Sequence, residues 1–148
     1  MKTWSHQTEI NAPIEQVWKL LNGSLEDMQK IMPNVIENEP IKETEEITGS
    51  IYRQKYQEGK RVQEYDVETL NYEDKPDHKE MKVGFILANM FEITAHYELD
   101  KIDDNTTHFR YTTTNNPLKT FLKLFMLFAS DKIVVKFVER VKNVAEAE

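Results

Sequence analysis

The segment INAPIEQVWKLL, residues 10–21, contains the sharpest change of pattern in the chain. Before it, residues 3–10 alternate with a period of two, which predicts a strand with one buried face. Within it, Asn11 can cap a helix whose first turn holds Pro13, where a missing N–H costs nothing. The segment therefore predicts a strand that passes directly into a helix.

The next part of the chain contains a second short helix and then a series of strands. Ser24 is a typical N-cap for a helix that ends at Pro33. From residue 35 to residue 114 the pattern is one of alternating strands and tight turns, which predicts about six strands. The acidic stretch 35–47 contains Pro40, and both features are typical of an edge strand.

The last predicted element is a helix that starts at Asn116-Pro117 and continues to Val144. About 30 residues of helix would extend roughly 45 Å. Its apolar residues recur at spacings of three and four, and four of the seven Phe residues lie within it. Such a broad apolar face requires the inner face of the sheet as its partner, so the order of elements predicts an α+β fold.

Length and composition indicate a single acidic domain. The chain has 148 residues, close to the commonest domain size, so residues 1–148 are expected to form one domain. A net charge of −7 argues against nucleic acid as a partner. The absence of cysteine excludes disulfides, thiolate metal sites and cysteine nucleophiles.

The apolar segments are too short for targeting or for membrane insertion. No stretch of signal-peptide length follows Met1, so a cytoplasmic protein is expected. The longest apolar run, residues 121–129, is far below the roughly 20 residues that span a bilayer. Residues 117–148 carry six basic and four acidic side chains beside their apolar surface. Burial under the sheet explains this surface, and transient membrane contact or a dimer interface stay open as alternatives, so the chain is expected to be a monomer or a homodimer.

A family resemblance covers the whole chain. Ala12-Pro13 leads into a helix with Val17-Trp18, followed by Met32-Pro33, by Gly49 before the strands, and by an aromatic-rich C-terminal helix. In this order the chain resembles the START-like, Bet v-type superfamily (SRPBCC), and it is most similar to bacterial polyketide cyclase/dehydrase-like members. The resemblance implies a helix-grip fold, with a curved antiparallel sheet of about six to seven strands around a long C-terminal helix and two short helices after strand 1. It also implies an internal cavity for an apolar molecule such as a lipid, a polyketide or a quinone.

Aromatic side chains are the candidates for ligand contacts. The alternation directs five tyrosines toward the interior, where each buried hydroxyl needs a hydrogen-bond partner. A cavity whose hydroxyls orient a ligand would explain them, and so would a rim position that lets the hydroxyls reach water. The expected ligand-binding residues are Trp4, His6, Tyr52, Tyr56, Tyr65, Phe85, Tyr97, Tyr111, Phe121, Phe125 and Phe128.

Two residues are candidates for acid–base catalysis. His6 alternates with Trp4 and Ile10 and is expected to face inward, either as a ligand or proton-transfer group or as a hydrogen-bonded core histidine. Glu64 alternates with Tyr65 and is expected to face solvent. A β-bulge would turn Glu64 inward, at the position where the resemblance to hormone-receptor relatives implies a carboxylate in the pocket.

No metal or cofactor site is expected. The histidines form no pair at i, i+2 or i, i+4, and the chain contains no phosphate-binding loop, nucleophile elbow or dinucleotide motif. His96 and His108 alternate with apolar residues and are expected on the solvent face of the sheet.

Three functions are consistent with this sequence. The leading hypothesis is a non-enzymatic binder or carrier of a small, mostly apolar molecule. A cyclase or dehydratase acting on such a ligand is the first alternative, and it needs His6 with a tyrosine, or Glu64, inside the cavity. A protein-binding, co-chaperone-like module is the second, and it would have a filled interior and could use the acidic segment 37–46.

Overall fold

The computed structural model describes residues 1–126 and 129–148, except for the side chains of residues 124 and 125. Seven strands and four helices make up this part of the chain. In chain order they are β1 (Lys2–Ile10), α1 (Ile14–Asn22), α2 (Leu25–Ile31), β2 (Val35–Lys42), β3 (Ile51–Glu58), β4 (Arg61–Asp74), β5 (His78–Leu87), β6 (Phe91–Asp103), β7 (Thr106–Pro117), α3 (Leu122–Met126) and α4 (Lys132–Ala147). Of the helices described, none is long and apolar enough to cross a bilayer.

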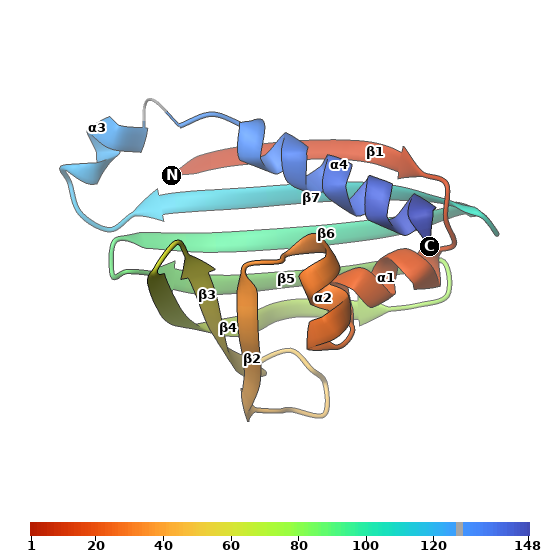
Figure 1. The fold of residues 1–148 in the computed structure, drawn as a ribbon, viewed down its shortest axis with the longest axis horizontal. Coiled ribbons are helices and arrows are strands. Elements are labelled where there is room, and N and C mark those ends of the chain that lie inside the picture. Colours follow the sequence, from red (N-terminus) through yellow and green to blue (C-terminus); the bar gives the residue numbers. More distant parts are fainter. Residues whose placement is uncertain (127–128) are drawn as a thin grey trace.

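All seven strands form one antiparallel sheet in the order β1-β7-β6-β5-β4-β3-β2. Helices α1, α2 and α4 lie against one face of this sheet (Figure 1). The α+β helix-grip fold is therefore confirmed, with the two short helices directly after β1. Strand β2 lies at an edge, where the missing N–H of Pro40 is tolerated.

The first helix begins differently from the expectation. Pro13, with extended backbone angles, is the N-cap of α1, and no side chain caps it. Asn11 instead donates its backbone N–H to the Glu146 carboxylate of α4, 2.8 Å away, which links the β1–α1 turn to the C-terminal helix. Helix α2 is capped as predicted, since the Ser24 hydroxyl accepts a hydrogen bond from the N–H of Asp27.

The prediction of one uninterrupted helix from Pro117 to Val144 is wrong. Strand β7 continues to Pro117, and α4 begins only at Lys132. The end of β7 lies beside β6, where Asn116 is opposite Glu92 and Pro117 is opposite Phe91. These pairings satisfy the backbone polar groups that a helix would otherwise satisfy, which favours a strand here.

The core lies between the sheet and one face of α4. The buried side chains of α4 are Val134, Val138, Val141 and Ala145, and they pack with residues of α1 and of the inner sheet face, such as Phe109. Ile133 is another apolar residue of this helix, but its side chain is 82% exposed. A helix only 16 residues long buries one narrow face, and Ile133 lies outside it.

Candidate ligand cavity

Four aromatic side chains from neighbouring strands line the space under the helices. Tyr65 of β4 stacks on Phe85 of β5, with ring centroids 4.8 Å apart. Tyr97 of β6 stacks on Tyr111 of β7 at 5.3 Å. Phe137 of α4 packs against this group from the helix side, with its ring centroid 4.7 Å from that of Tyr111. All four strand residues occupy inner-face positions because successive side chains of a strand point to opposite faces.

The four rings from the strands border a cavity of about 180 Å³. Met28 and Met32 line it from the α2 side, and Met32 is an adaptable side chain that suits a variable ligand surface. A second hollow of about 130 Å³ adjoins it toward β2 and includes Tyr52 and Asn38. Neither space alone reaches the roughly 300 Å³ of a typical ligand pocket. They share lining residues, Gln54 among them, and so form neighbouring compartments of one interior.

The polar groups of this interior are hydrogen-bonding groups that stay uncharged at neutral pH. Burial, with a smaller contribution from Tyr56, raises the pKa of Tyr65 to about 12. Burial also raises the pKa of Tyr97 well above its ordinary value and raises the pKa of Tyr111. The Asn38 side-chain oxygen is buried and accepts no hydrogen bond from the residues described. A ligand with a donor group would satisfy this oxygen, which is costly to leave unpaired.

A wider hollow of about 560 Å³ opens between α4 and the turn after α2. It shares Met32 and Tyr56 with the inner cavity, so those two side chains stand at the boundary between mouth and interior. The Tyr56 hydroxyl accepts a hydrogen bond from the Asn34 side chain at 3.2 Å, which holds the ring at this boundary. Lys136 and Arg140 of α4 line the same mouth.

The structure has the architecture that the sequence resemblance implied. The sheet packs against a helix, and an aromatic cavity lies between them. The family model described as "Polyketide cyclase / dehydrase and lipid transport" matches residues 1–146. The chain belongs to this family. No curated protein matches the chain.

Solved structures with the same fold are distant in sequence from this family member. The di-domain ARO/CYC protein BexL superposes with a TM-score of 0.76 at 12% identity, over 99% of this chain and 47% of that one. The chain thus spans about half the length of BexL. The Zhui aromatase/cyclase from a Streptomyces species gives 0.72 at 14% identity, over 98% and 93% of the two chains. Norcoclaurine synthase from Thalictrum flavum gives 0.69 at 14%, over 99% and 94%. These likenesses show the fold alone.

The cavity of this polyketide cyclase/dehydrase family member contains about half of the expected ligand residues. Tyr56, Tyr65, Phe85, Tyr97 and Tyr111 line the larger compartment, and Tyr52 lines the smaller one. Trp4 and His6 lie on the inner face at the β1 edge, His6 directly opposite Tyr111, but neither borders these compartments. Trp4 instead lies near Lys2, whose Nζ is 5.7 Å from the ring centroid.

The remaining expected residues do not line the cavity or fall outside the described part. Phe121 is 69% exposed, because it precedes the short α3 and does not lie on a long buried helix. The Phe125 side chain and all of Phe128 lie outside the described residues. Glu64 faces away from the cavity, 3.6 Å from the Arg53 guanidinium, because the β3–β4 register has no bulge.

The sequence did not identify the residues at the mouth, or the amide side chains of the interior, as candidate ligand contacts. Gln54 lies on the inner face between Tyr52 and Tyr56, and their alternation could have identified it. Lys136 and Arg140 could not be identified in this way. Their position depends on the turn after α2, about 100 residues earlier in the chain.

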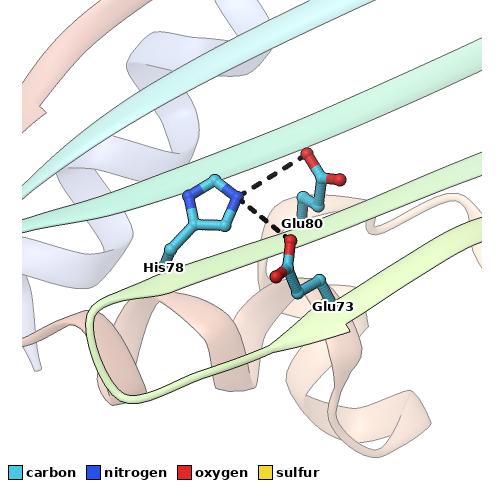
Figure 2. Close-up of side chains that lie close together, drawn as sticks. All are labelled: Glu73, His78 and Glu80. Carbon is cyan, nitrogen blue, oxygen red and sulfur yellow. Dashed lines mark ion pairs between the residues drawn. The ribbon is translucent and has the colours of Figure 1, made fainter.

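The outer sheet face contains the described groups that could hold a metal ion. Glu73, His78 and Glu80 bring one ligand atom each to a common point, with the His78 Nε2 3.7 Å from each carboxylate (Figure 2). Glu80, His96 and Glu98 form a similar group. The sequence showed no histidine pair here, because the sheet register, and not sequence spacing, brings each histidine to its carboxylates. The side chain of Asp100, 2.7 Å from Nδ1, raises the pKa of His78.

A buried lysine links the sheet to α1. Lys79 is almost fully buried beside Trp18 and is paired with Asp74 and with Glu15 of α1. Burial by itself lowers the pKa of Lys79, but the two carboxylates outweigh it and the pKa is raised. The two carboxylates therefore favour the charged form of this lysine, which joins the sheet to α1.

Proposed function

We propose that this protein binds and carries a small, mostly apolar molecule in the cavity between the sheet and the helices. The observation that supports this most directly is the composition of the cavity wall, which is aromatic and aliphatic with a few tyrosine hydroxyls and amides. Such a wall suits an apolar body with one or two polar groups that fix its orientation. Membership of a family described by cyclase, dehydrase and lipid transport supports the same class of ligand.

The raised pKa values of the cavity tyrosines argue against any of them as a general base. With a pKa near 12, Tyr65 keeps its proton at neutral pH and is available as a hydrogen-bonding group. A general base works best when its pKa lies near the operating pH. The same holds for Tyr97 and Tyr111, whose pKa values burial also raises.

A cyclase or dehydratase remains the second candidate because of one placement. His6 faces inward and pairs across the strands with Tyr111, which lines the cavity. An imidazole at that place could exchange a proton with a ligand that reaches beyond Tyr111. Turnover abolished by His6→Gln, with ligand binding unchanged, would favour the enzyme over the carrier. The third hypothesis, a protein-binding module, expected a filled interior and is not favoured by the cavity.

The test measures binding of an uncharged fluorescent probe, N-phenylnaphthylamine, to the full chain. Val83 lines both compartments, so Val83→Phe is expected to weaken binding at least tenfold by filling them. Val62→Phe is the matched control, since it makes the same change at a half-exposed valine on the outer face of β4 that lines neither compartment. Equal binding by both variants, or no saturable binding by the unmodified chain, would contradict the proposal. Native mass spectrometry of the purified protein would identify a retained ligand.

A further inference from the structure

The mouth of the cavity differs in charge from the rest of the molecule. The chain has a net charge of −7, so an anion approaching at random meets a repulsive protein. The hollow between α4 and the turn after α2 has only two charged residues in its wall, and both are cations, Lys136 and Arg140. A local positive site on an acidic protein requires an explanation of its own.

The two cations have no carboxylate partner in the part of the chain that the structure describes. Neither lies within 4.0 Å of an Asp or Glu oxygen, although Glu139 is their neighbour on the same helix. Lys136 and Arg140 are one helical turn apart, where like charges destabilise a helix by a few tenths of a kcal/mol. The arrangement therefore costs stability and gains no internal ion pair.

One contact fixes the position of Arg140 at the mouth. Its Nη1 donates to the backbone carbonyl of Ile31, the last residue of α2, at 3.2 Å. This bond uses one of the five N–H donors of the guanidinium. The other donors stay available for an oxyanion, which a guanidinium can bind through two parallel hydrogen bonds.

The surroundings of the cations are apolar. Ile133, Phe137 and Pro33 line the same hollow, and Met32 and Tyr56 line both this hollow and the aromatic cavity. A molecule that extended from the interior past these two side chains would pass from aromatic and aliphatic walls to two cations. Its apolar body would lie inside and its charged group outside.

We propose that the ligand is an amphipathic anion, with its apolar or aromatic body in the cavity and a carboxylate or phosphate group bound by Lys136 and Arg140. This inference rests on the proposed function and adds the charge and the orientation of the ligand. The shared chemistry is an oxyanion on an apolar body, whether it comes from a free acid or from a lipid headgroup.

The test compares three probes of the same shape, naphthylacetate, naphthylethanol and naphthylethylamine, in displacement of N-phenylnaphthylamine from the full chain. The acid is expected to bind about tenfold more tightly than the alcohol at low salt, and the amine to bind most weakly. In high salt the preference for the acid is expected to shrink, because ions screen charges at an exposed mouth.

Variants of Lys136 test whether the preference for the acid arises at the mouth. Lys136→Gln is expected to weaken binding of the acid about threefold to fivefold and to leave the alcohol unchanged, as for a partly exposed ion pair. Lys136→Glu is expected to abolish the preference. Lys82→Gln is the control, because it makes the same change in net charge on the outer face of β5.

The outcomes separate this inference from the proposed function. If no probe displaces N-phenylnaphthylamine, or if that dye does not bind, the cavity proposal itself fails. If the alcohol binds as tightly as the acid, or Lys136→Gln and Lys82→Gln behave alike, only the inference fails.

Sedimentation with phosphatidylglycerol vesicles tests whether the oxyanion can come from a lipid headgroup. If it does, Lys136→Gln is expected to weaken binding to the vesicles as well as binding of the acid. Vesicle binding without any preference among the free probes would overturn the inference in favour of a membrane surface.

Discussion

The two faces of the sheet are built from the same strands and serve different purposes. On the inner face, Tyr65, Phe85, Tyr97 and Tyr111 stack in pairs, and their hydroxyls are the main polar groups. On the outer face of the same strands, Glu73, Glu80 and Glu98 stand directly opposite one another in a row. A buried cavity wall holds few charges because it is costly to remove a charge from water, whereas a solvated surface tolerates charges. Alternate residues along one strand thus meet two opposite requirements.

The largest expected difference between the faces is in stability. Phe109 is fully buried on the inner face of β7, and Phe109→Ala is expected to lower the free energy of unfolding by about 3–5 kcal/mol through lost burial and a new cavity. Arg110 is the next residue of the strand and lies on the outer face. Arg110→Ala is expected to change the free energy of unfolding by less than about 0.5 kcal/mol. Urea unfolding measures both, and similar losses in the two variants would contradict the assignment of the core.

The second prediction concerns the inner face at alkaline pH. Tyrosines in the unfolded chain titrate near pH 10, whereas burial raises the pKa of Tyr65 to about 12 and raises those of Tyr97 and Tyr111. The folded state therefore holds these protons more strongly than the unfolded state. Their contribution to stability is complete below pH 10 and is lost as the pH rises through 12.

Urea unfolding between pH 8 and pH 12 checks this window, together with phenolate absorbance of the folded protein. Tyr65→Phe is expected to make the loss of stability with rising pH less steep, because one late-titrating group is gone. The prediction fails if every tyrosine titrates together near pH 10 in a chain that is still folded.

The third prediction tests the outer face near neutral pH. The Asp100 carboxylate raises the pKa of His78, so the protonated imidazole stabilises the folded state. This stabilisation is present below the unfolded pKa of about 6.5 and disappears as the pH rises through the higher folded pKa. At pH 5.5, His78→Asn is expected to lower the free energy of unfolding by about 0.5 kcal/mol. At pH 9 the same change is expected to leave it almost unaltered.

His108→Asn is the comparison variant for this measurement, because His108 lies on the same face directly opposite Asp100 but, unlike His78, forms no ion pair with that carboxylate. Titration of the histidine ring protons by NMR would give the pKa of His78 directly. A value at or below that of an unfolded chain would disprove the prediction.

The smallest expected effect is the repulsion within the glutamate row. At pH 9, Glu80→Gln removes the middle charge of three and is expected to raise the free energy of unfolding by about 0.3 kcal/mol. Glu92→Gln on the same face is the control, since the residues opposite Glu92 are Ile86 and Asn116. Destabilisation by Glu80→Gln at this pH would mean that its hydrogen bond with Asn71 outweighs the repulsion.

The sequence alone determined which face each strand residue occupies wherever the alternation is strict. Tyr65 and Val67 face inward and Glu64 faces outward, as the period of two predicts, because the ladder between β3 and β4 runs without a bulge. It also determined the order of elements and the capping of α2 by Ser24, since caps and turns depend on neighbours within a few residues. These are local properties, and local chemistry sufficed.

Only the tertiary structure decided the features that depend on distant parts of the chain. Residues 116 and 117 extend β7, where a helix was predicted to begin, because β6 lies beside them and places Glu92 opposite Asn116 and Phe91 opposite Pro117. His78 meets Glu73 and Glu80 through strand register, and Arg140 reaches the mouth through the carbonyl of Ile31. Long-range pairing and packing override local preference in these places, and the candidate ligand site depends on them.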